Sequence, residues 1–130
     1  MAQRSAITAD DILAAVGGFM KDLEDISLDV PAAPRVLGRV VGLGAGQGLF
    51  ELSEAGNQAK EVEGAEPRRN FVAAALLGYK EVKGEEDMVG AVKKSGVDVA
   101  ALLAKDDEFE SHLPSVAEFA KESGLGSVVL

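Results

Sequence analysis

The sequence predicts an all-α protein made of short antiparallel helices that stack like a HEAT-type repeat. In several segments, apolar residues recur at spacings of three and four, which is the period of an amphipathic helix. Proline and glycine stand at the ends of these segments, where helices begin and end. We find no stretch with the alternating pattern of a strand. The 130 residues, 47% of them hydrophobic, are enough to bury one core without disulfides.

The first helix is expected over residues 9–24. Thr8 stands three positions before Asp11, which resembles a capping box with Asp in the place of Glu. The apolar residues at helical spacing then form one face; they are Ile12, Val16, Phe19, Met20 and Leu23.

Pro31 and Pro34 suit the first turn of a second helix. Its apolar stripe consists of Val36, Leu37, Val40 and Val41. The glycine-rich run Gly42–Gly48 predicts that this helix stops and a loop follows. A short helix is expected around 49–55, and the polar stretch 56–66 is interpreted as a linker.

Four helices are expected in the second half. Pro67 opens one, with an apolar side formed by Phe71, Ala74, Ala75 and Leu77. The adjacent Arg68 and Arg69 are interpreted as exposed charges on the opposite side. A helix over 85–95 is expected to stop at Gly96. Another spans 98–104, and the last spans 114–121 with Gly124 as its stop.

We divide the chain into residues 1–59 and an acidic helical segment, 60–130, that packs on the first part. The acidic cluster 105–110 is interpreted as a solvated helix start, because it lacks the glycine and the ligand spacing of a calcium loop. His112 is expected at the surface of a helix end, because its neighbours supply neither a positioned nucleophile nor an oxyanion hole.

Composition excludes several functional classes. Thirteen basic and 22 acidic residues give a net charge of −9, which disfavours direct binding to nucleic acid and to anionic lipid. The absence of cysteine excludes thiolate chemistry and zinc–thiolate sites. No apolar run is long enough to span a membrane, and the N-terminus lacks a signal core. We therefore expect a cytoplasmic, non-enzymatic protein with no metal and no cofactor.

The glycine run allows one remote alternative, a nucleotide-binding oxidoreductase that uses Gly42–Gly48 as a phosphate-binding turn. The dinucleotide fingerprint needs glycines at the first, third and sixth places. Counting from Gly42 or Gly44, the sixth place holds Gln47 or Leu49. A helix-ending loop is the preferred interpretation.

The segment around Asp25 and Asp29 is the main candidate binding site. We expect the intervening Ile26 and Leu28 to point inward and fix an acidic loop, and Pro31 to restrict its backbone. Pre-organised carboxylates lose little entropy when they meet an arginine or a lysine. Asp22 and Glu24 add negative potential that would steer a basic partner. For Asp29, capping of the following helix is the alternative role.

Residues 7–41 resemble the MI domain, the helical module of eukaryotic translation-initiation scaffolds and of programmed cell death protein 4. The similarity is carried by the string from Asp25 to Pro34 (DISLDVPAAP), followed by Leu37. The family's recurring pattern is Asp-apolar-x-Leu-Asp-Val-Pro-x-Ala-Pro-x-x-Leu, and every fixed position is met. In the family this motif lies near the end of the domain, so we expect a partial or rearranged MI domain here.

The resemblance implies a function in translation initiation. MI domains bind a DEAD-box RNA helicase, and two aspartates of this motif contact it; the matching residues here are Asp25 and Asp29. The chain would then be a protein-binding module that docks the helicase with Asp25, Asp29, Asp22, Glu24 and Pro31. The alternative is a helical scaffold or assembly subunit that has lost helicase binding and binds another protein.

Overall fold

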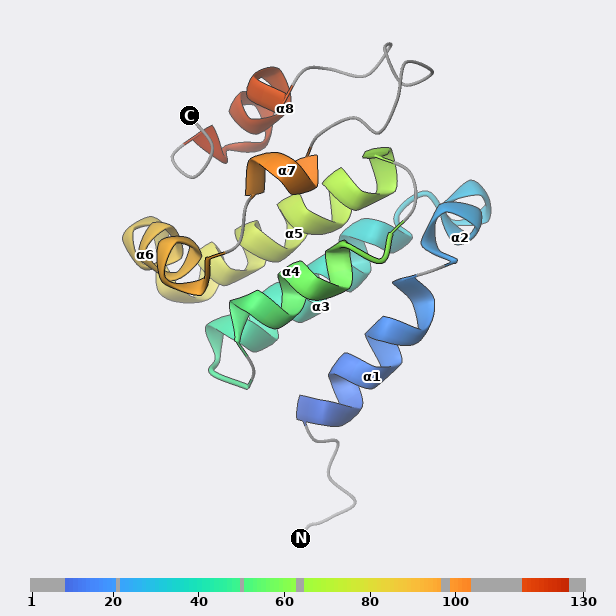
Figure 1. Ribbon diagram of the computed structural model, residues 1–130, viewed down its shortest axis with the longest axis horizontal. Helices are drawn as coiled ribbons and strands as arrows, with labels where there is room; N and C mark the ends of the chain where they lie inside the picture. Colours follow the sequence, from blue (N-terminus) through green and yellow to red (C-terminus); the bar gives the residue numbers. More distant parts are fainter. Residues whose placement is uncertain are drawn as a thin grey trace, which may run out of the picture.

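The computed structural model describes residues 9–20, 22–49, 51–62, 65–96, 99–103 and 116–126, and all regular secondary structure in them is α-helical (Figure 1). This confirms the all-α prediction, whereas the repeat stack remains a prediction. The helices are α1 (Ala9–Met20), α2 (Leu23–Asp29), α3 (Ala33–Gly46), α4 (Leu52–Ala59), α5 (Ala65–Lys83), α6 (Glu85–Ser95), α7 (Val99–Leu103) and α8 (Val116–Ser123).

Helix α5 is the centre of the fold and contacts α2, α3, α4, α6 and α7. Successive helices α3, α4 and α5 alternate in direction, so α3 and α5 run the same way (Figure 1). One buried cluster takes residues from α1 to α8 and from both sides of position 60. Its fully buried members include Met20, Leu23, Val41, Phe71, Met88, Leu103, Ala120 and Leu125.

The closest packing in the fold joins α3 to α5 through glycines spaced four residues apart. A β-carbon built on Gly38 would lie 2.3 Å from the carbonyl oxygen of Phe71, and one on Gly42 would lie 2.0 Å from that of Ala75. On Gly46 it would lie 2.7 Å from the β-carbon of Val82. The contacting positions on α3 (38, 42 and 46) and on α5 (71, 75 and 82) increase together along the chain. This order is expected for parallel helices whose backbones touch.

Helix α5 contributes a small residue to the same interface. A β-carbon on Gly78 would lie 3.1 Å from the carbonyl oxygen of Arg39 and 3.3 Å from Cα of Gly42. Beside this contact, the Arg39 guanidinium donates two hydrogen bonds to Glu81, with Nη1–Oε2 2.6 Å and Nη2–Oε1 3.0 Å. The ion pair therefore borders the glycine interface on its exposed side.

The prediction that Gly42–Gly48 forms a loop is wrong for most of the run. Helix α3 continues through Gly46, because its glycines lie against α5 rather than in solvent. The expected stop occurs later, at Gly48, whose φ of +82° suits glycine. There the N–H of Leu49 donates to the carbonyl of Gly44 at 3.0 Å and closes the helix end.

Two further boundaries differ from expectation. The helix predicted over 9–24 is two helices, α1 and α2, which turn at Asp22 so that Met20 and Leu23 both reach the core. The helix expected around 49–55 is α4, displaced toward the C-terminus, so part of the predicted linker is helical. The N–H of Glu51 donates to the Glu54 carboxylate at 3.1 Å and fixes the start of α4.

The later helices occur where the proline and glycine signals placed them. Pro67 lies in the first turn of α5, and Gly96 and Gly124 have φ of +74° and +77° just after α6 and α8. Acidic residues in the first turn of α6 and lysines in its last turn match the helix dipole. The cluster 105–110 and His112 lie outside the described residues.

The prediction that Arg68 and Arg69 are exposed is wrong. They are 7% and 1% exposed, respectively. Arg68 Nε donates to the carbonyl of Leu102 at 2.7 Å, and Arg69 Nε donates to that of Leu103 at 2.5 Å. The Arg69 guanidinium also stacks 5.2 Å from the ring centre of Phe119. The two arginines thus satisfy the last carbonyls of α7 and fasten α7 to α5.

Replacing Gly42 by Ala is expected to lower the free energy of unfolding by about 1–3 kcal/mol, because the new methyl group forces α3 away from α5. The matched control is Gly90→Ala in α6, where nothing lies within 4 Å of the added carbon; it is expected to gain up to about 1 kcal/mol from helix propensity. Urea unfolding followed by circular dichroism measures both. Equal stability of Gly42→Ala and wild type would contradict the close contact.

Replacing Arg69 by Met keeps an apolar stem but removes the donor to Leu103, and is expected to cost about 1–3 kcal/mol because a buried carbonyl loses its partner. Arg35→Met, at an exposed position on α3, serves as the control and should change stability little. Urea unfolding again provides the comparison. An Arg69→Met protein as stable as this control would refute the buried fastening role.

Candidate protein-binding site

The short helix α2 carries the predicted site residues and is held to the core by Leu23, which is fully buried. The Ser27 hydroxyl donates to the carbonyl of Glu24 at 2.7 Å within the helix. The N–H of Val30 donates to the carbonyl of Ile26 at 2.8 Å and ends it. The first turn of α3 contains Pro34 as predicted, whereas Pro31 lies before the N-cap of α3 and not in its first turn.

Four carboxylates are exposed on this segment: Asp22, Glu24, Asp25 and Asp29. No side-chain hydrogen bond or ion pair engages any of the four in the part of the chain that the structure describes. Asp25 and Asp29 lie four residues apart and therefore project from one side of α2. They were expected in a loop; the structure places them on a helix, which fixes their relative orientation.

The inward anchor of this segment differs from the prediction. Leu28 is 78% exposed, and Ile26 is only partly buried. Leu23 takes the anchoring role because it lies on the side of α2 that faces the core. The prediction that Leu28 points inward is therefore wrong, whereas Leu23 was expected on an apolar helix face and is buried.

The alternative role of Asp29 as a cap of α3 is also wrong. The N-cap of α3 is Ala32, and no side chain caps this end. Asp29 is instead the last residue of α2, where the helix dipole disfavours a negative charge and no basic residue offsets it. The placement of Asp29 therefore brings α2 no electrostatic benefit.

An apolar groove borders the acidic helix. It is lined by Phe19 of α1, Ile26 of α2, Val30 just after α2, and Ala33, Val36 and Leu37 of α3, and its volume is about 260 Å³. Ala33 and Leu37 form its floor against the core, whereas Phe19, Val30 and Val36 are each about half exposed. This groove could not be predicted from the sequence, because it forms only where the ends of three helices meet.

The order of residues around α2 places the carboxylates next to the groove. With 100° between successive residues, Val30 and Ile26 follow Leu23 on the groove side, and Asp22 and Asp29 come next. Asp25 lies one step further round. The acidic edge formed by Asp22, Asp25 and Asp29 and the apolar groove are thus neighbouring parts of one surface.

The nearest cations on α3 do not neutralise this edge. Arg39 is engaged by Glu81, and this hydrogen bond and charge hold the pKa of the Glu81 carboxyl below its usual value. Arg35 lines a separate pocket on the other side of α3, together with Glu122 of α8. Among the described residues, neither of these α3 arginines therefore pairs with a carboxylate of α2.

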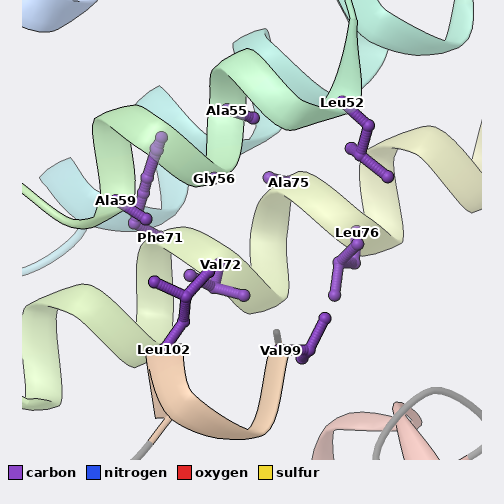
Figure 2. A pocket seen from close by; sticks show the side chains of 10 residues that line it. All are labelled: Leu52, Ala55, Gly56, Ala59, Phe71, Val72, Ala75, Leu76, Val99 and Leu102. Carbon is purple, nitrogen blue, oxygen red and sulfur yellow. The ribbon is translucent and has the colours of Figure 1, made fainter. Parts of the chain in front are cut away.

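A second apolar pocket lies between α4, α5 and α7 (Figure 2). Its walls include Leu52, Phe71, Leu76, Val99 and Leu102, whose side chains approach it from all three helices. Its volume of about 20 Å³ is little more than one water molecule occupies, and its lining offers no polar partner. We interpret it as space that the side chains of the three helices leave unfilled where they pack.

A polar cleft occurs at the opposite end of α3 and α5 from the groove. Its volume is about 510 Å³, and Tyr79, Lys83, Lys94, Glu51 and Ser53 are among its lining residues. The two lysines occupy the last turns of α5 and α6, where a cation offsets the helix dipole. Their positions are explained by helix stability, and no ligand is assigned to the cleft.

The structure provides no geometry for the nucleotide-binding alternative. Gly42, Gly44 and Gly46 lie inside α3 and are buried, not in a turn between a strand and a helix. Among the described residues, no group of His, Cys, Asp and Glu is arranged to hold a metal ion, and no helix is long and apolar enough to cross a membrane.

Comparison with known proteins found no matching family model, no matching curated protein and no matching solved structure.

Replacing Asp29 by Lys is expected to raise the free energy of unfolding by about 0.3–1 kcal/mol, because it puts a cation at the C-terminal end of α2. Asp22→Lys, at the N-terminal end of the same helix, is the control and should lower stability by a similar amount. Both are measured by urea unfolding. A loss of about 1 kcal/mol or more in Asp29→Lys would instead indicate a capping role.

Proposed function

We propose that this protein is a non-enzymatic binding module that docks a DEAD-box RNA helicase of translation initiation through the acidic face of α2. The observation that carries the proposal is a set of four exposed carboxylates, three on α2 and one just before it, none of which pairs with another side chain among the described residues. Asp25 and Asp29 are the central contacts, with Asp22, Glu24 and Pro31 beside them. The helicase is suggested by the resemblance of the segment from Asp25 to Pro34 to the MI-domain motif.

Electrostatics support a basic partner surface for this face. Arginine and lysine side chains form strong hydrogen bonds with carboxylates, and arginine binds them in a two-pronged manner. The net charge of −9 would steer such a surface toward the protein. Because α2 is anchored by Leu23 and bounded by Pro31, its carboxylates need little ordering on binding.

The effect on the helicase would be a shift between its open and closed arrangements. A module that binds one arrangement more tightly raises the population of that arrangement and takes no part in the chemical step. Whether the module activates or inhibits depends on which arrangement it prefers.

The second candidate is a helical scaffold that binds a different protein through an apolar helix face. It is favoured by the exposure of Val36 and Val40, 57% and 45%, on successive turns of α3. In that case the acidic face would contribute to docking without any specificity for a helicase.

Isothermal titration calorimetry against a eukaryotic DEAD-box initiation helicase, at low and moderate salt, tests the proposal. We expect saturable binding that weakens with salt, and a loss of about tenfold or more in affinity for Asp25→Lys plus Asp29→Lys, equivalent to about 1.4 kcal/mol or more. Circular dichroism should show an unchanged helical signal in this variant.

The matched control is Glu86→Lys plus Glu122→Lys, which makes the same change in net charge at exposed positions on α6 and α8. It should retain most of the affinity. An equal loss of affinity in both double variants would show that the effect comes from net charge alone. Absence of binding by the wild type would reject the helicase as partner and favour the scaffold candidate.

A further inference from the structure

The geometry points to a second element of recognition: the groove between α1, α2 and α3 receives one large apolar side chain from a basic peptide segment of the partner. The inference deepens the proposed function and rests on it for the location of the partner at α2. It adds an apolar anchor site to the charge contacts and specifies a partner segment in which a Leu, Met, Phe or Trp is flanked by Lys or Arg.

The groove has the size and lining of an anchor site. Its volume of about 260 Å³ is below the range of pockets that enclose a whole small-molecule ligand. All of its exposed lining is apolar, and Phe19 and Val36 leave about half of their surfaces, 48% and 57%, in water. A buried apolar side chain surrounded by weaker contacts is the usual core of a protein interface.

Charge selects a basic peptide over a second copy of this chain. In a symmetric dimer across the groove, Asp22 and Asp29 of one protomer would approach the same residues of the other, and like charges would repel. Each protomer also carries a net charge of −9, which opposes self-association. A peptide segment with Lys or Arg on both sides of its apolar anchor residue is attracted electrostatically to the carboxylates of α2.

The two arginines of α3 that the structure describes do not reverse this preference. The guanidinium of Arg39 is engaged by Glu81, and Arg35 borders the pocket on the far side of α3. The apolar surface continues from Val36 to Val40, one turn along α3. A partner segment that runs along α3 would therefore extend over further apolar surface.

Fluorescence anisotropy with the full chain tests the inference. The probes are short labelled peptides with Lys and Arg on both sides of a central Leu, Met, Phe or Trp. Two controls keep the length: one replaces the central residue by Ser, and the other replaces the basic residues by Glu. We expect saturable binding by at least one apolar-centred peptide, and binding at least about tenfold weaker by both controls.

Two variants of the protein locate the binding. Val36→Ser removes an exposed wall of the groove and should weaken the best peptide by about tenfold. Leu49→Ser removes a similarly exposed apolar side chain, 47% exposed, at the opposite end of α3 and should leave binding unchanged. Asp22→Asn plus Asp29→Asn should weaken binding and reduce its dependence on salt.

Each result decides the inference. Failure of every peptide to bind, equal binding by the Ser-centred control, or equal loss in Leu49→Ser and Val36→Ser would overturn it. Sedimentation analysis showing a dimer that Val36→Ser dissociates would overturn it in favour of a second copy.

The helicase titration separates this inference from the proposed function. Peptide binding without helicase binding would reject the helicase and keep the anchor site. Helicase binding that is insensitive to Val36→Ser, with no peptide binding, would reject the anchor site and keep the proposed function.

Discussion

The direct contact between the backbones of α3 and α5 is the constraint on which the rest of the fold depends. Side chains normally hold helix axes 8–10 Å apart, whereas Gly38 and Gly42 leave no room for even a β-carbon against α5. This closeness brings many peptide groups into dispersion contact and compensates for a composition with few aromatic residues. Helices α4, α6 and α7 then pack around α5, whose position is already determined.

The same contact gives α3 two faces with different uses. The face that bears Gly42 is committed to α5, and the exposed face that bears Val36 is left for other contacts. Because α3 cannot rotate without separating the glycines from α5, the orientation of its exposed face is fixed. Helix α2, joined to α3 through Pro31, receives its position from this arrangement. A rigid core pair thus supports a binding surface on elements that are themselves short.

Local signals predicted much of the fold, and long-range contacts explain the errors. Helix ends at Gly96 and Gly124 could be predicted because a left-handed residue after a helix is a local requirement. Gly42 was misassigned because the same residue type also permits close helix packing, and only the partner helix distinguishes the two uses. The burial of Arg69 depends on carbonyls of α7, 34 positions away. For the candidate site, the acidic residues and Pro31 could be identified from the sequence. The groove could not, because it is formed by the ends of three helices that come together only in the folded chain.

The void between α4, α5 and α7 has a consequence for the response of the protein to pressure. Space that side chains leave unfilled in the folded protein is filled by water after unfolding, which reduces the volume of the system. A space of about 20 Å³ per molecule sets the scale of this contribution at on the order of 10 mL/mol. One wall of the void is α7, a helix of five residues fastened from α5 by arginine hydrogen bonds. Compression therefore favours separation of α7 from α5, because this separation opens the space between them to water.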